Sequence, residues 1–257
     1  MKIKDMKIAL FTIVSKEFAR IIRIWPQTLI PPVTTMLLYF VIFGEIIGKN
    51  LELIDGVSYI TYIIPGLVMN AVIINSFGNT VSSFFSAKMH HNIEEMLVSP
   101  MPNWLIVMGY VIGGMIRGLI VGALVTIVAC FFVKINPAHW LFTLIVMILS
   151  SMLFATLGII NALFAKTYDD ISWIPTFVLT PLVYLGGVFY PISILPEFWQ
   201  NISLFNPILY IVNAFRYGIL EISSVNPYIA LSSIFIFNII IFISTCKMMN
   251  MGIGIKK

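Results

Sequence analysis

The sequence predicts an all-α membrane protein with six transmembrane helices, and its composition and its long uncharged runs lead to that prediction. Of the 257 residues, 60% are apolar and only 10% are charged. Soluble domains average about 45–50% apolar and about 25% charged residues, so a soluble fold could not hide this much apolar surface. The same composition excludes a disordered chain. We expect a single transmembrane domain that covers residues 1–257.

Residues 1–25 predict an amphipathic helix that lies along the cytoplasmic interface. Apolar and basic side chains alternate there at helical spacing, and no long apolar stretch is followed by a small-residue cleavage site, so a cleavable signal is not expected. The apolar face is predicted to hold Ile3, Met6, Leu10, Ile13, Val14, Phe18 and Ile21, and the polar face Lys4, Lys7, Lys16 and Arg20.

Six later segments are long and apolar enough to cross a bilayer, which takes about 20 residues. The third segment must contain Arg117, because neither piece beside it is long enough alone. Eleven of the 15 lysines and arginines fall on the side of the N-terminus, which predicts that both termini are cytoplasmic. The predicted spans are 28–48, 59–83, 106–132, 139–164, 172–190 and 226–247.

Two connections between the spans carry further structure. Residues 88–103 form a short polar cytoplasmic connection with a helical centre, which Pro100 and Pro102 close. Residues 191–224 are too apolar for a solvated loop but are broken by prolines. They predict an outer re-entrant segment of short helices at or within the outer interface.

Arg117 is the one charged residue inside a predicted span, and such residues are functional candidates by default. We expect it to extend to the inner interface or to pair with Glu94, Glu95 or Asp170. Contact with a substrate headgroup is the alternative.

Small and polar residues form two stripes in the second and third spans. Gly114, Gly118 and Gly122 share one helix face, which favours close helix packing within the subunit over a dimer seam or a sliding surface. Asn75 and Asn79 also share a face, and lining a pathway and bonding between helices are equally open roles for them.

Several function classes are excluded or disfavoured. The basic residues form no patch with aromatics, so no nucleic-acid partner is expected. The string 44–50 lacks the spacing and the Ser/Thr of a phosphate-binding loop, so any ATP would be bound by another chain. His90 and His91 point in different directions on a helix, and no cofactor or metal is expected.

Four segments in order resemble type-2 ATP-binding cassette (ABC) exporter permeases: residues 25–44, 92–100, 175–191 and 206–218. The chain looks closest to the short bacterial inner-membrane permeases of the drug and nodulation-factor export group. This resemblance implies two permease subunits, usually identical, each bound to a separate ABC ATPase. It also implies alternating access that exports an amphiphilic substrate such as a drug, a lipid, or a glycolipid or saccharide.

The resemblance further implies that the segment between the second and third spans holds the coupling helix. Together with the amphipathic N-terminal helix it would form the surface that docks the ATPase. The residues carried over to the coupling helix are Asn92, Glu94, Glu95, Met96, Leu97 and Pro100.

Two rival functions stay open. An ion-coupled secondary transporter would normally need a carboxylate at mid-membrane, and all 11 acids fall outside the predicted span centres. A membrane-embedded lipid-processing enzyme would need several carboxylates around a metal, and only the adjacent pair Asp169 and Asp170 suggests one.

Overall fold

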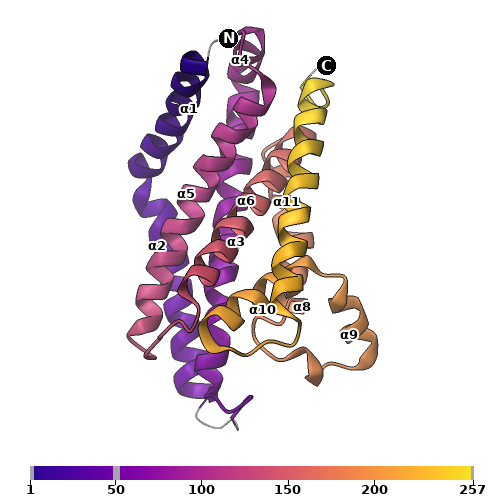
Figure 1. Cartoon of the computed structure of the whole chain (residues 1–257). Helices are drawn as coiled ribbons and strands as arrows, with labels where there is room; N and C mark the ends of the chain where they lie inside the picture. The colour runs from indigo at the N-terminus through magenta and orange to yellow at the C-terminus, as the bar shows by residue number, and fades with distance from the viewer. Residues whose placement is uncertain (1–2, 49–52, 256–257) are drawn as a thin grey trace.

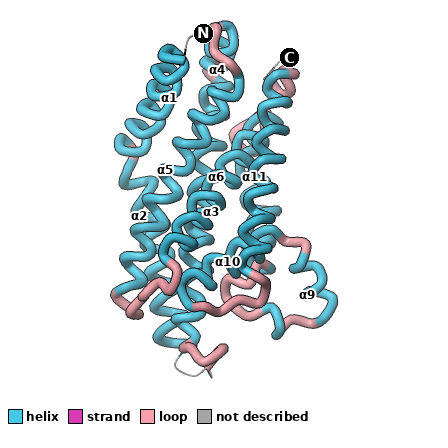
Figure 2. The backbone as a smooth tube through the Cα atoms, in the orientation of Figure 1, coloured by secondary structure: helices cyan, strands magenta, loops and turns pink. Residues whose placement is uncertain are grey.

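The computed structural model describes residues 3–48 and 53–255, which form a bundle of helices joined by loops (Figures 1 and 2). Within those residues the β pairing is one isolated bridge between Ile54 and Val57, so the all-α prediction is confirmed. The helices are α1 (Ile3–Arg23), α2 (Trp25–Tyr39), η1 (Phe40–Ile47), α3 (Tyr59–Met89), α4 (Asn92–Val98), α5 (Asn103–Cys130), α6 (Trp140–Phe164), α7 (Asp170–Ile174), η3 (Pro175–Leu179), α8 (Thr180–Leu185), η4 (Ile192–Ile194), α9 (Glu197–Leu204), α10 (Pro207–Leu220) and α11 (Pro227–Asn250).

In the described part of the chain, five helices are long and apolar enough to cross a membrane. They correspond to five of the six predicted spans and cover Trp25–Gly44, Tyr59–Met89, Asn103–Cys130, Trp140–Phe164 and Pro227–Asn250.

The span predicted at 172–190 is shorter in the structure. Helices α7, η3 and α8 together cover Asp170–Leu185, about 24 Å at 1.5 Å per residue, against about 30 Å for a hydrocarbon core. The run ends because Gly187 adopts a φ of 70°, a left-handed conformation that stops a helix. Its backbone also contains a π-helical stretch that begins at Pro175, which has no N–H to donate.

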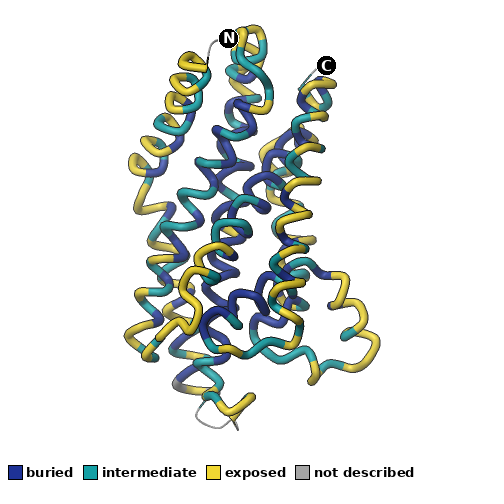
Figure 3. The backbone as a smooth tube through the Cα atoms, viewed as in Figure 1, coloured by how far each residue is buried: buried dark blue, intermediate teal, exposed yellow. Residues whose placement is uncertain are grey.

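Helix α3 is the centre of the bundle, as its dark blue colour in Figure 3 indicates. Between residues 62 and 85 every residue is buried except three that lie four apart. These three, Ile74, Gly78 and Ser82, form one narrow line along the helix, which we call the α3 strip.

The predicted glycine stripe lies between helices of the same chain. A Cβ on Gly114 would meet the Thr80 hydroxyl and would lie 2.9 Å from the Ser76 carbonyl oxygen of α3. A Cβ on Gly118 would meet the Ser76 hydroxyl, and one on Gly122 would meet the end of the Met147 side chain of α6. The stripe therefore lets α5 approach α3 and α6 closely.

A second pair of glycines on α5 receives α1. A Cβ on Gly109 would lie 2.6 Å from the Ile13 side chain, and one on Gly113 would lie 2.7 Å from Cβ of Glu17. Because the contacts advance in the same direction on both helices, α1 runs alongside the first half of α5 (Figure 1).

The predicted faces of α1 need correction. Its buried residues are Ile13, Glu17 and Ile21, whereas the predicted apolar residues Ile3 and Phe18 are 71% and 43% exposed. The reason is that the glycines of α5 and the polar partners on α3 determine which face of α1 packs against the bundle. Apolar content alone does not identify that face.

The beginning of α1, the helix α4 and the end of α11 lie at one end of the bundle (Figure 1). Lys88 reinforces this end, because its Nζ donates to the backbone oxygens of Leu163 at 2.7 Å and Ala165 at 2.8 Å. These carbonyls close α6, where a lysine satisfies acceptors that the helix itself leaves unbonded.

The opposite end contains the short helices predicted for residues 191–224. Arg216 lies in this segment, which the sequence predicts at or within the outer interface, and it is 1% exposed within α10. Its Nη2 donates to Gly187 O at 2.7 Å, its Nε donates to Tyr62 O at 3.3 Å, and its guanidinium lies over the Tyr62 ring. Arg216 thus holds α10 against α3 and the turn after α8, where three elements meet.

We expect Gly114→Ala to lower the free energy of unfolding by about 1–3 kcal/mol, because the added methyl group collides with Thr80 and Ser76. The matched control is Gly78→Ala on α3, where a Cβ has nothing within 4 Å. The control is expected to stabilise the helix by up to about 1 kcal/mol. Thermal unfolding of the purified variants in detergent measures both, and equal stability of the two variants would contradict the packing described for Gly114.

Candidate functional site

Polar side chains of α3 face α1 and α5 inside the bundle. Ser76 and Thr80 bond within their own helix, to Val72 O at 2.7 Å and to Ser76 O at 3.1 Å. Asn75, Asn79 and Ser83 are instead in contact with side chains from other helices. The two asparagines predicted to share a face therefore bond between helices, while lying beside the α3 strip.

Arg117 lies halfway along α5 and reaches α3. Its Nη2 donates to Asn75 Oδ1 at 3.3 Å, and Asn75 Nδ2 donates to Ala71 O at 2.9 Å. The predicted pairing with Glu94, Glu95 or Asp170 is wrong, since none of the described ion pairs joins Arg117 to an acid. Glu94 instead lies against His91, and Asp170 accepts from two backbone N–H groups.

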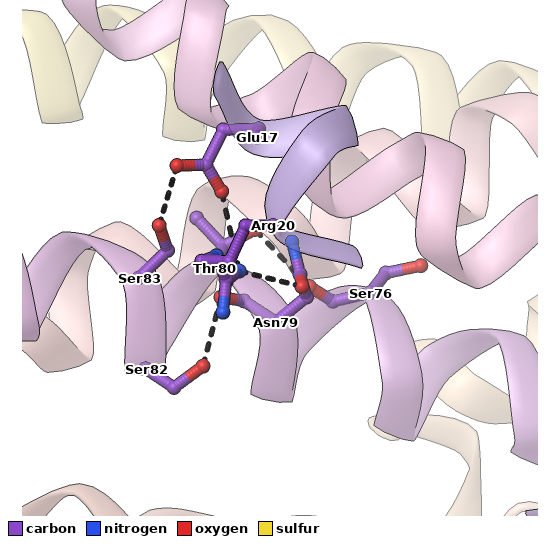
Figure 4. A network of polar contacts seen from close by, with 7 residues as sticks. All are labelled: Glu17, Arg20, Ser76, Asn79, Thr80, Ser82 and Ser83. Atoms are coloured by element: carbon purple, nitrogen blue, oxygen red, sulfur yellow. Dashed lines mark hydrogen bonds and ion pairs between the residues drawn. The ribbon is translucent and has the colours of Figure 1, made fainter. Parts of the chain in front are cut away.

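A network of polar contacts joins α1 to α3 one turn from Asn75 (Figure 4). Glu17 is 2% exposed, and its two oxygens accept from Ser83 Oγ at 2.6 Å and from Arg20 Nη2 at 3.2 Å. Arg20 Nη2 also donates to Asn79 Oδ1 at 2.7 Å. We call these four residues the Arg20 network.

Sequence reasoning missed Glu17 and assigned Arg20 to the polar face of an interfacial helix. A signal was present, because Glu17 lies four residues from both Ile13 and Ile21 and so shares their face. A carboxylate inside the apolar stripe of a helix is expected to have a partner when it is buried. The partner could not be named, since Ser83 lies 66 positions further along the chain.

The predicted coupling helix is the short helix α4. It follows a sharp turn at His91, whose φ is 59°, and it is anchored by Ile93, which is fully buried. Glu94 and Glu95 are exposed, and Glu94 Oε1 lies 3.0 Å from His91 Nδ1. Of the other carried-over residues, Pro100 is exposed and Asn92, Met96 and Leu97 are partly buried.

Val98 at the tip of α4 is 89% exposed and was not among the residues selected from the sequence. Its side chain adds an apolar group to the exposed surface that the two glutamates form. The tip of α4 thus offers negative charge and an apolar side chain next to each other, at the end of the bundle where α1 begins (Figure 1).

Asp169 and Asp170 lie at the turn that begins α7. Asp170 Oδ2 accepts from the backbone N–H groups of Lys166 and Thr167 at 2.8 and 2.9 Å, and Thr167 Oγ1 accepts from the Asp170 N–H. This reciprocal pair is a capping box, which stabilises the start of a helix. Among the described residues no three His, Cys, Asp or Glu side chains are grouped to hold a metal ion.

A cavity of about 670 Å³ lies among the ends of η1, α3 and α8. Two of its hydroxyls are used internally, since Tyr59 donates to Phe189 O at 3.1 Å and Tyr190 donates to Tyr184 O at 2.9 Å. The lining is largely apolar and aromatic. The aromatic residues that line it are Tyr39, Phe43, Tyr59, Tyr184, Phe189 and Tyr190.

Glu17→Ala is expected to loosen α1, because it leaves Arg20 and Ser83 without their shared partner. We expect a loss of about 1–3 kcal/mol, less than for a fully buried ion pair because the Arg20 side chain is 29% exposed. Hydrogen exchange of the α1 amides measures the effect, with exposed Lys16→Ala as the matched control on the same helix. Unchanged exchange in Glu17→Ala would show that the network does not hold α1.

Comparisons with known proteins agree with this architecture. The family described as ABC-2 type transporter matches residues 8–220. The chain is 48% identical over 250 residues to the Inner membrane transport permease YadH of Escherichia coli (strain K12), a match that covers 97% of each chain. It is 26% identical over 183 residues to Nodulation protein J of Rhizobium leguminosarum bv. viciae, covering 70% of each.

The family match covers most of the chain, including α3, α4 and α5 and the polar residues between them. The resemblance noted in the four sequence segments is therefore confirmed. The chain belongs to the ABC-2 type transporter family and is a multi-pass membrane transport subunit.

Proposed function

We propose that this chain is the permease subunit of an ATP-driven exporter in a bacterial inner membrane, and that a separate ABC ATPase docks on α4. Family membership implies an ATPase partner. The observation that carries the proposal is the tip of α4, where Glu94, Glu95 and Val98 are exposed on a helix that Ile93 anchors in the core. Basic, amide and apolar groups on the ATPase would complement this surface.

Helix α4 is well placed to transmit movement. It connects α3 to α5, and Ile93 belongs to the same apolar cluster as Phe84 of α3 and Ile106 of α5. Because α5 also packs on α1, a displacement of α4 would reach three helices. ATP binding by the partner would then favour one packing of the helices over another. Alternating access would be this shift between the populations of two packings.

A second permease subunit, identical to this one, would complete the pathway. Helix α2 is mostly exposed, α7 has no buried residue, and α7 borders the α3 strip at Gly78. A second copy placed against them would enclose the strip, together with Asn75, Asn79 and Arg117, between the two subunits. Polar side chains at this depth would then meet protein or water rather than lipid.

The arrangement of the ends supports a cytoplasmic location for both termini. The start of α1, the end of α11 and α4 share one end of the bundle, and α9 and α10 lie at the other (Figure 1). An ATPase is cytoplasmic, so docking on α4 places both termini inside. The cavity lined by aromatics would then lie towards the outer side, where it suits an amphiphile such as a drug, a lipid or a glycolipid.

An ion-coupled secondary transporter is the second candidate, because Glu17 is a buried carboxylate of the kind that such transporters use. The Glu17 oxygens are held by Arg20 and Ser83, which favours a structural role. A membrane-embedded lipid-processing enzyme has no comparable observation in its favour.

The test is to express the chain with a neighbouring ABC ATPase, purify the complex through a tag on the permease and measure ATPase activity in lipid. We expect a stoichiometric complex. The double variant Glu94→Lys/Glu95→Lys should reduce association roughly tenfold or more, since like charges would then face each other. The matched control is Glu197→Lys, an exposed acid of α9 at the opposite end of the bundle.

A permease that purifies without an ATPase, and that moves substrate in response to a proton or sodium gradient, would favour the secondary transporter. Full ATPase association and coupling in the Glu94→Lys/Glu95→Lys variant would show that docking uses another surface.

A further inference from the structure

Among the described residues, the polar contacts between α1, α3 and α5 leave three buried nitrogen donors of arginine and asparagine side chains without a partner. They are Arg20 Nε, Asn79 Nδ2 and Arg117 Nε. Asn79 is 0% exposed, and the orientation of its amide is determined because Arg20 donates to Oδ1. An unpaired buried donor costs about 1–3 kcal/mol, so all three would gain from an acceptor.

The same region carries an uncompensated positive charge. Arg20 and Arg117 contribute two charges, and they donate to Asn79 and Asn75, which lie one turn apart on α3. Among the described ion pairs, Glu17 is the carboxylate that pairs with Arg20, and none of them includes Arg117. Inside an apolar bundle an unpaired charge is costly, so the region favours an anion.

The α3 strip provides access to this region. Asn75 and Asn79 each follow a strip residue directly in the sequence, and a Cβ on Gly78 would have nothing within 4 Å. The Arg20 side chain is 29% exposed, and Ile74 in the strip is 45% exposed. The donors therefore border the one line along which the buried part of α3 is open, and that line has the apolar residue Ile74 at one end.

We propose that Arg20, Asn79 and Arg117 form a binding site for an oxyanion headgroup, a phosphate or carboxylate carried by an amphiphile whose apolar part lies along the α3 strip. Guanidinium and amide donors match the oxygens of such groups, and hydrogen bonds between charged partners are the strong ones. The inference deepens the proposed function, on which it rests, by naming anionic amphiphiles as the substrate class.

Such a ligand would accept hydrogen bonds from donors on three helices that now have no partner. Arg20 comes from α1, Asn79 from α3 and Arg117 from α5. Helices α3 and α5 adjoin α4, and α1 packs on α5, so a bound anion would favour one packing of the bundle at the end where the ATPase docks. Its binding and the state of the ATPase would then affect each other reciprocally.

The experiment measures binding to the full-length chain in a neutral detergent, from the shift in thermal unfolding during titration. The probe is short-chain phosphatidic acid, with short-chain phosphatidylcholine as the zwitterionic comparison and inorganic phosphate as the tail-free comparison. We expect phosphatidic acid to bind at least tenfold more tightly than phosphatidylcholine.

Two variants test the residues. Arg117→Gln removes one charge, and Asn79→Asp puts a carboxylate where the unpaired amide nitrogen lies while keeping an acceptor for Arg20. Each should weaken phosphatidic acid binding at least tenfold. The matched control is Arg23→Gln, which removes an exposed charge from α1 and should bind as the parent does. If Arg117→Gln does not fold, the binding of phosphatidic acid to Asn79→Asp alone tests the proposal.

The comparison with inorganic phosphate separates two sources of the anion. Binding of phosphatidic acid alone supports an amphiphile, and equal binding of inorganic phosphate supports the oxyanion site but assigns it to a free anion. Equal binding of phosphatidylcholine, no binding by the parent chain, or undiminished binding in Asn79→Asp overturns the proposal. The assay contains no ATP and no ATPase, so failure of the proposed function, seen as failure to recruit an ATPase, is a separate result.

Discussion

The close approach of α5 to its neighbours is the constraint on which the rest of the structure depends. Glycines on one face bring it against α3 and α6, and Gly109 and Gly113 on another face admit α1. In a membrane, apolar side chains gain little from leaving lipid for each other, so association of helices relies on close packing and on polar contacts. Glycines make both possible, because they bring backbones close enough for short side chains to meet.

Polar groups in this bundle are satisfied in two ways. The hydroxyls of Ser76 and Thr80 donate to carbonyls in the preceding turn of their own helix. They therefore need no partner from another helix. The arginines and Glu17 cannot do so and need partners from other helices. Arg216 at one end and Arg20 nearer the other thereby join segments that lie far apart in the sequence.

The two ends of the molecule differ in chemistry, as expected for a transport subunit. The end with α4 presents exposed carboxylates and a protruding valine on a firmly anchored turn. The other end presents short helices and a cavity lined by aromatic rings. The polar side chains of α3, α5 and α1 occupy the bundle between them, so the proposed ligand would contact the helices that join the two ends.

The sequence by itself determined the membrane class, five long spans close to their predicted bounds, the short helix α4 and the family. Those features depend on local properties, namely apolar run length, charge and breaks at proline or glycine, which are visible along the chain. Only the tertiary structure decided that Arg117 meets Asn75, that Glu17 and Arg20 face α3, and that Arg216 is buried. The physical reason is that these charged side chains are placed by partners on other helices and turns, 29 to 154 positions away in the sequence. The periodicity of one helix carries no information about which helix lies beside it.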